Sequence, residues 1–226
     1  MCGRPKNSKR NSKPILEKQY KILKSYINGL DTFQTTKTKW IRSLELLYMS
    51  GMRVSEILDI RVKDIKDGCD NGELSIFVKK QQIIRHIPLS EKSVRVLKNL
   101  ISDESDIDGY FIHRRNNVLS KLNANGFTKE INDLIQMVLD DNYSSHSFRK
   151  GIITEMGVSG INPKIIQHFI AHKNVSTTLN YIKPTAEDIR NALLRWKNRL
   201  HQITQLSQIP LWWTQWVNYQ PLLKVF

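Results

Sequence analysis

Five side chains that could act on a phosphate group occur in a fixed order along the 226-residue chain: Arg53, His146, Arg149, His172 and Tyr181. Arg53 lies at the junction of two expected helices. His146 and Arg149 are three residues apart, so they share one helix face. Taken singly, each has a commoner structural explanation: an ion pair for the arginine, a satisfied hydrogen bond for the histidine, core packing for the tyrosine. Together they indicate one chemistry.

That chemistry is phosphodiester transfer through a covalent tyrosine intermediate. Two guanidiniums can hold two non-bridging oxygens bidentately, which lysine does less well. A tyrosine hydroxyl, with an ordinary pKa of about 10, needs nearby positive charge and an imidazole to attack phosphorus. The departing 5′ oxygen needs a proton, which a lysine on a hairpin can deliver. Because arginines stabilise the charge, we expect neither a metal nor another cofactor; the sequence has no P-loop and no carboxylate cluster with nuclease spacing.

Three motifs resemble those of the tyrosine recombinase, or phage integrase, family. Gly51–Leu58 is similar to its first box, which carries the first catalytic arginine. Ser145–Lys150 is similar to its second box, His-x-x-Arg. Ile170–His172 followed by Ser176–Tyr181 is similar to its closing motif, although Ala171 stands where the family usually has glycine. The resemblance runs from about Trp40 to about Lys183.

A fourth part of the resemblance is an expected hairpin that ends in Ile87–Leu89, similar to the family's Val-Pro-Leu. Counting back from Pro88 without gaps places the family's hairpin lysine on Lys80. Lys79 is adjacent, so it stays an alternative. The family's glycines around that lysine are replaced here by Lys79 and Gln81.

The resemblance implies a role for each site residue. Tyr181 attacks the scissile phosphate and forms a 3′-phosphotyrosyl link, while Arg53 and Arg149 hold the non-bridging oxygens. Glu56 supports the first arginine or the local fold.

The remaining three residues handle protons and position the phosphate. Lys80 is the general acid for the 5′ hydroxyl, and His146 is the acid/base partner for the tyrosine proton. His172 hydrogen-bonds the phosphate. The bond energy is stored in the phosphotyrosine, so the resemblance implies no ATP.

Hydrophobic periodicity predicts a mainly α-helical protein with one small antiparallel sheet, an α+β class and a tyrosine recombinase-like catalytic domain. Expected helices lie at 14–29, around 40–50, 56–58 with Ser55 as N-cap, 91–101, 128–140, 145–157, from 163 onward, just before 181, and from Thr185 onward. The expected hairpin pairs residues 74–78 with 83–87, after turns at Asp67-Gly68 and Asn71-Gly72. Residues 110–112 are expected to form a brief strand.

The charge points to a polyanion partner. The chain has 35 Lys plus Arg against 21 Asp plus Glu, a formal charge of +14, which favours nucleic acid first and an anionic membrane surface second. Several of these charges lie in an N-terminal arm without apolar periodicity, for which a solvated tail is the alternative. We expect DNA contacts from Arg4, Lys6, Lys9, Arg10 and Lys79.

Composition also limits the compartment. Cys2 and Cys69 are far apart, which excludes a disulfide framework and a cysteine-based zinc site and fits a reducing compartment. No apolar run approaches the roughly 20 residues that span a bilayer. We therefore expect no integral membrane association and a cytoplasmic protein associated with DNA or the nucleoid.

We expect three segments: a basic arm and short helix at 1–35, a catalytic domain at 36–200 and an aromatic-rich tail at 201–226. Family members usually carry a separate helical DNA-clamping domain ahead of the catalytic one, whereas fewer than 40 residues precede Trp40 here. We expect DNA encirclement from the arm, from another protein or from tetramer packing; the alternative is a minimal or truncated form of the family.

The expected partner is double-stranded DNA, bound by a homotetramer, with a DNA-bending or full-length recombinase protein as a possible accessory. Trp212, Trp213 and Trp216 in the tail could dock on a neighbouring subunit, pack on their own domain or contact a membrane surface. Two alternatives to a recombinase stay open: a type IB topoisomerase that relaxes DNA, and a non-enzymatic DNA-binding regulator of a full-length recombinase.

Overall fold

The structure is a computed structural model that describes residues 12–102, 106–114, 117–182 and 186–206. The predicted DNA contacts Arg4, Lys6, Lys9 and Arg10, and the tail with its three tryptophans, lie outside the described residues. The chain divides into two compact units, Met1–Ile182 and Lys183–Phe226.

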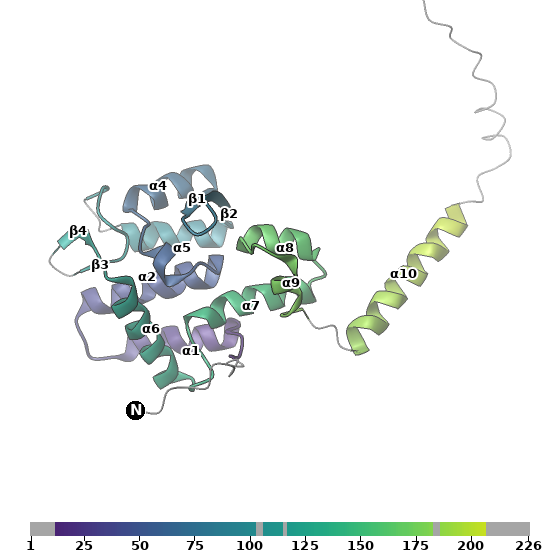
Figure 1. The fold of residues 1–226 in the computed structure, drawn as a ribbon, viewed down its shortest axis with the longest axis horizontal. Coiled ribbons are helices and arrows are strands. Elements are labelled where there is room, and N and C mark those ends of the chain that lie inside the picture. Colours follow the sequence, from purple (N-terminus) through teal and green to yellow (C-terminus); the bar gives the residue numbers. More distant parts are fainter. Residues whose placement is uncertain (1–11, 103–105, 115–116, 183–185, 207–226) are drawn as a thin grey trace, which may run out of the picture. The chain divides into compact units, whose positions relative to one another are not determined.

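The first unit is mainly helical, which confirms the predicted class. Its helices are α1 (Glu17–Gly29), α2 (Gln34–Ser50), α3 (Val54–Ile57), α4 (Val62–Asn71), α5 (Glu91–Ile101), α6 (Ala124–Val138), α7 (Ser145–Val158), α8 (Pro163–Ile170) and α9 (Val175–Leu179). Its strands are β1 (Glu73–Val78), β2 (Ile83–Pro88), β3 (His113–Arg114) and β4 (Asn117–Lys121). Helices α1, α2, α6 and α7 pack together, and β1 and β2 lie with α4 and α5 (Figure 1).

The second unit contains α10 (Ala186–Leu206), in the region predicted to be an amphipathic helix. Ile189, Leu193 and Trp196 of this helix are exposed. No helix in the described part of the chain is long and apolar enough to cross a membrane.

Helix α2 ends where the sequence predicts, at Gly51. This residue takes the left-handed conformation, with φ of +60°, which glycine adopts without the strain that a Cβ causes. A side chain is also excluded by packing, because a Cβ would lie 3.1 Å from Ile170 Cδ1 and 3.4 Å from Arg149 Cα. The end of α2 therefore comes close to both α7 and α8.

The predicted hairpin is confirmed, with β1 and β2 antiparallel and paired from Glu73–Pro88 to Val78–Ile83. Every second residue of β1 is buried, as a sheet with one solvated face requires. The buried positions of β2 are Arg85 and Ile87, so an arginine occupies a core-facing position.

The predicted turn at Asp67-Gly68 is wrong, because α4 runs through it to Asn71. Burial of Val62, Ile65 and Cys69 on one face drives this helix. Gly68 serves close packing instead, since a Cβ there would lie 3.3 Å from the Glu73 carbonyl oxygen.

Two other local predictions need correction. Helix α3 begins at Val54 with Arg53, not Ser55, as its N-cap residue, because the Glu56 carboxylate accepts a hydrogen bond from the Arg53 backbone N–H at 2.9 Å. Residues 110–112 do not form a strand: Tyr110 makes an isolated bridge to Arg61. The paired residues come just after, in β3 and β4.

The segment before α1 lies along α7. The Ile15 backbone N–H donates to the Ser147 carbonyl oxygen at 2.9 Å, and the Ile15 side chain is 1% exposed. A Cβ on Gly151 would lie 2.0 Å from the Ile15 carbonyl oxygen. Glycine at this position of α7 therefore allows the two backbones to touch.

Replacing Gly151 with alanine is expected to destabilise the protein, because the new methyl group and the Ile15 carbonyl cannot occupy the same space. Overpacking of this kind costs about 1–3 kcal/mol or more. Urea unfolding should show a lower midpoint. The matched control is Gly29→Ala in α1, where a Cβ would meet no atom within 4 Å and the gain in helix propensity is up to about 1 kcal/mol. Equal midpoints for the two variants would contradict this packing.

Candidate active site

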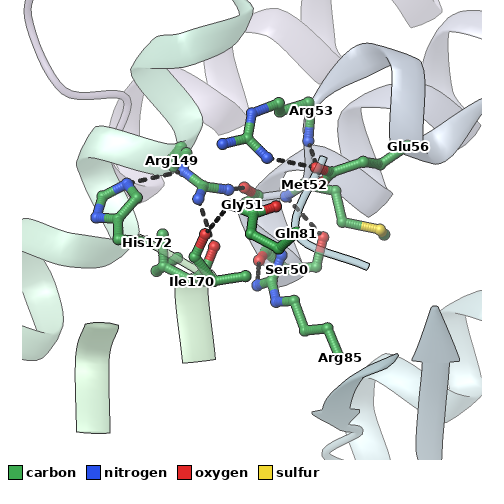
Figure 2. Close-up of polar contacts among 11 residues, drawn as sticks. Ser50, Gly51, Met52, Arg53, Glu56, Gln81, Arg85, Arg149, Ile170 and His172 are labelled. Carbon is green, nitrogen blue, oxygen red and sulfur yellow. Dashed lines mark hydrogen bonds and ion pairs between the residues drawn. The ribbon is translucent and has the colours of Figure 1, made fainter. Parts of the chain in front are cut away.

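Arg53 follows the turn between α2 and α3 and is held at both ends by Glu56. Its Nη1 lies 2.5 Å from Glu56 Oε1, and its backbone N–H donates to Glu56 Oε2. The predicted supporting role of Glu56 agrees with this contact. Among the described residues, the second Nη group and Nε of Arg53 have no hydrogen-bond partner, and they lie on the side away from that carboxylate (Figure 2).

Arg149 lies on α7 and is 6% exposed. Its Nη1 donates to the Gly51 carbonyl oxygen at 2.9 Å, its Nη2 donates to the Ile170 carbonyl oxygen, and its Nε donates to His172 Nε2 at 3.3 Å. The two carbonyls end α2 and α8, where the helix dipole is negative. A guanidinium has five N–H bonds, and these contacts use three of them. One N–H on each Nη is left, the number needed for bidentate binding of a phosphate.

Burial first, and then the neighbouring charges of Arg53 and Arg85, lower the pKa of Arg149 to about 9. The group still carries its charge at neutral pH. The like charges of Arg53 and Arg85 repel the buried Arg149 guanidinium, and this repulsion destabilises the site. A bound anion relieves the repulsion.

His172, the residue after the α8 cap, bonds through both ring nitrogens. Its Nε2 accepts from Arg149, and its Nδ1 lies 3.0 Å from Thr178 Oγ1. Burial first, and then the charge of Arg149, lowers the pKa of His172 to about 4. The ring is therefore neutral at neutral pH, with its proton on Nδ1 facing Thr178. In this arrangement the imidazole orients Arg149, and the expected hydrogen bond from His172 to the phosphate stays a prediction.

Tyr181 lies in the turn after α9, beside these groups. Its ring centroid is 6.4 Å from that of His172, and Lys150 Nζ is 5.9 Å from the Tyr181 ring centroid. The side chain is 37% exposed, so a substrate can reach it. Lys150 also donates to the Ser12 carbonyl oxygen, which ties the N-terminal segment to the same place.

His146 lies one turn before Arg149 on α7 and lines a pocket of about 200 Å³ together with Arg53. Reduced hydration by the surrounding protein, followed by the charges of Arg149 and Arg53, lowers the pKa of His146. The residue keeps an exposed surface. A neutral imidazole open to solvent can accept a proton.

Lys80 lies in the four-residue turn of the hairpin and is exposed. Lys79 is the alternative hairpin lysine and also a predicted DNA contact. Its Nζ forms an ion pair with Asp59 Oδ2 at 3.0 Å. Gln81 on the other side donates from Nε2 to the Ala171 carbonyl oxygen at 2.7 Å. No described contact joins Lys80 itself to the arginines.

Arg85 is a site residue that the motifs missed. It is 3% exposed, donates from Nη2 to the Ser50 carbonyl oxygen, and lies with its guanidinium 4.9 Å from the Phe169 ring centroid. Burial lowers its pKa to about 10. Figure 2 shows Arg53, Arg149 and Arg85 gathered around the Ser50–Met52 turn. The sequence did contain one signal for Arg85: a charged residue at a position of the alternating strand that is expected to face the core.

Three guanidiniums gather at the Ser50–Met52 turn, and the partly exposed Tyr181 ring lies beside His172, which contacts Arg149. This combination is suited to an anion attacked by a hydroxyl. Within the described residues, no group of three His, Cys, Asp or Glu side chains could hold a metal ion.

Comparison with known proteins supports this interpretation. The sequence model of the Phage integrase family matches residues 13–188. The tyrosine recombinase XerA of Pyrococcus horikoshii is 28% identical over 193 residues, 84% of this chain and 63% of that protein. The tyrosine recombinase XerC of Bacillus subtilis is 26% identical over 197 residues, 84% of this chain and 63% of that protein. The chain therefore spans about three fifths of the length of these curated relatives.

Solved structures agree on the fold. The Tn1549 transposon integrase, solved in complex with a circular intermediate DNA, superposes with a TM-score of 0.66 at 21% identity, covering 84% of this chain and 68% of that one. The XerA recombinase gives a TM-score of 0.60 at 19% identity, covering 85% of this chain and 66% of that one. The family model matches well over half of the chain, and on this basis the chain belongs to the phage integrase family.

Proposed function

We propose that this chain catalyses site-specific DNA strand cleavage and rejoining, as a tyrosine recombinase or integrase. The observation that carries the proposal is the chain of contacts from Gly51 through Arg149 to His172, with the Tyr181 ring beside that imidazole. Family membership and the names of the relatives support the same activity.

The proposed reaction is a reversible transesterification. The Tyr181 oxygen attacks phosphorus, so the tyrosine O–P bond forms and the bond between phosphorus and the 5′ oxygen breaks. The tyrosine proton passes to His146, and Lys80 donates a proton to the leaving 5′ oxygen. The energy of the broken bond is kept in the 3′-phosphotyrosyl link, so a 5′ hydroxyl can reverse both steps.

The arginines stabilise the transition state in this scheme. Arg149 offers its two remaining N–H bonds to the non-bridging oxygens, and Arg53 approaches them from the α3 side. Arg85 lies deeper and adds positive potential without contacting the phosphate. Fixed donors aimed at developing charge are worth about 10²–10³ in rate each.

The proposed substrate is double-stranded DNA, bound by a homotetramer in the cytoplasm at the nucleoid. The formal charge of +14 and the DNA complexes of the Tn1549 integrase and of the XerH recombinase support DNA as the ligand. The exposed apolar residues of α10 suit a contact between subunits. We further propose that a DNA-bending or full-length recombinase protein assists.

The test is formation of a covalent adduct. Duplexes that this chain selects from a random-sequence pool would be rebuilt with a nick beside the cleavage position, so that cleavage releases a short fragment and cannot reverse. We expect a protease-sensitive adduct that survives detergent, with the DNA attached through its 3′ phosphate and mapped to Tyr181 by mass spectrometry. Absence of an adduct on every bound duplex, or attachment to another residue, would overturn the proposal.

The topoisomerase and the non-enzymatic regulator are not favoured, because the relatives and solved structures named above are recombinases and integrases. Relaxation of supercoiled plasmid without strand exchange would favour the topoisomerase.

A further inference from the structure

We propose that Gln81 is a positioning residue, which holds the hairpin turn, and with it Lys80, against the loop that carries His172. This inference rests on the proposed function, since it assigns Lys80 the proton transfer to the leaving oxygen. Gln81 stands where the family resemblance expects glycine, and its side chain reaches across the site to the Ala171 carbonyl oxygen.

The anchoring contact is short and joins distant parts of the chain. Gln81 Nε2 donates to the Ala171 carbonyl oxygen at 2.7 Å, across 90 residues of sequence. Ala171 is buried and left-handed, with φ of +54°, and caps α8 immediately before His172. The hydrogen bond therefore ties the hairpin turn to the backbone that also places His172 next to Arg149.

The turn is held on its other side as well. Lys79 pairs with Asp59 at 3.0 Å, and Lys121 of β4 contacts the same carboxylate. Within the turn, the backbone N–H groups of Gln81 and Gln82 both donate to the Val78 carbonyl oxygen. Lys80 thus lies between two anchored neighbours while its own side chain stays exposed.

The Gln81 side chain does not have the features of a purely stabilising contact. Its Oε1 is buried and has no hydrogen-bond partner among the described residues. An unpaired buried acceptor costs about 1–3 kcal/mol, comparable to what a single hydrogen bond contributes. The Gln81 amide therefore contributes little net stability to the folded chain. Its hydrogen bond can instead fix the distance from the general acid, Lys80, to the leaving oxygen. Misplacement by about 1 Å can slow a reaction about 100-fold.

The test compares two leaving groups. One nicked duplex carries the ordinary phosphodiester, and the other has sulfur in place of the bridging 5′ oxygen. A thiol with a pKa of about 8.5 leaves as the thiolate without a proton, whereas an alkoxide, whose conjugate acid is about as weak as water at roughly 15.7, needs one. Gln81→Ala is expected to slow adduct formation about 10- to 100-fold on the oxygen substrate and less than about threefold on the sulfur substrate.

Three further variants make the result specific. Lys80→Ala should show the same pattern with a larger loss on oxygen. Gln81→Glu keeps the size of the side chain but has no N–H to donate, so it should behave like Gln81→Ala. Ser75→Ala, on the exposed face of β1, should match the unmodified chain on both substrates.

The outcomes separate the two proposals. If the unmodified chain forms no adduct on either substrate, the proposed function fails. If it does, and Gln81→Ala slows both substrates equally, slows neither or accelerates cleavage, the role of Gln81 fails while the proposed function stands. Lack of sulfur rescue for Lys80→Ala would also overturn the inference.

Discussion

Tyr181→Phe is expected to bind DNA with unchanged affinity and to form no covalent adduct. The substitution removes one oxygen atom. The aromatic ring that lies beside His172 and beneath the Lys150 ammonium is kept, so folding and DNA affinity should not change. Without the hydroxyl there is no nucleophile, and the loss should be complete within the detection limit of a gel that separates free from protein-linked DNA.

The matched control is Tyr26→Phe on α1. Tyr26 has the same exposed fraction as Tyr181, 37%, and its hydroxyl contacts Met137 Sδ at 3.8 Å, a weak interaction. This variant should form the adduct at the rate of the unmodified chain. An adduct formed by Tyr181→Phe at a measurable rate would show that another residue is the nucleophile.

Arg149→Lys is the second variant with a large expected effect, a loss of at least about 10²–10³ in the rate of adduct formation. A guanidinium contacts Gly51, Ile170 and His172 in three directions and still offers two N–H bonds. An ammonium has three donors in total, so it cannot make the same contacts and also bind two phosphate oxygens. DNA affinity depends on the many other cations and should change by less than about tenfold.

Stability has to be measured in parallel for this variant. Leaving buried carbonyl groups without donors costs about 1–3 kcal/mol each, so the urea midpoint of Arg149→Lys should fall. Cleavage should therefore be measured under conditions in which the variant remains folded. Arg95→Lys, at an exposed position on α5, is the control for the change of residue type. Equal losses of binding and of cleavage would mean that Arg149 acts mainly as a DNA contact.

Local patterns predicted the elements that carry the site. Asn162 followed by Pro163 predicts the start of α8, and the Asn162 side chain does cap it, accepting from the Lys164 backbone N–H at 2.8 Å. Gly51 predicts the end of α2, and period-two alternation predicts β1 and β2. Each of these signals depends on residues within one turn or strand, which is why one sequence suffices to detect them.

Asp67-Gly68 shows where such signals fail. The dipeptide favours a turn, but burial of the apolar face of α4 outweighs that local preference. Gly68 is retained because β1 passes too close for a side chain. Gly151 is a second glycine that is needed for close packing. Its neighbour is Ile15, which is far away in sequence, so local patterns cannot reveal this role.

Residue types and their spacing determined which side chains are candidates for phosphoryl chemistry in this protein, because a phosphate needs bidentate cations and a nucleophile whatever the fold. Only the tertiary structure decided how they are held. The contacts from Arg149 to Gly51, from Gln81 to Ala171 and from Arg85 to Ser50 span 98, 90 and 35 residues. These hydrogen bonds form because the helix ends and the hairpin pack against one another. Local periodicity does not indicate which backbone carbonyl groups will be free to accept a hydrogen bond. The same packing holds Lys79 in an ion pair and leaves Lys80 exposed.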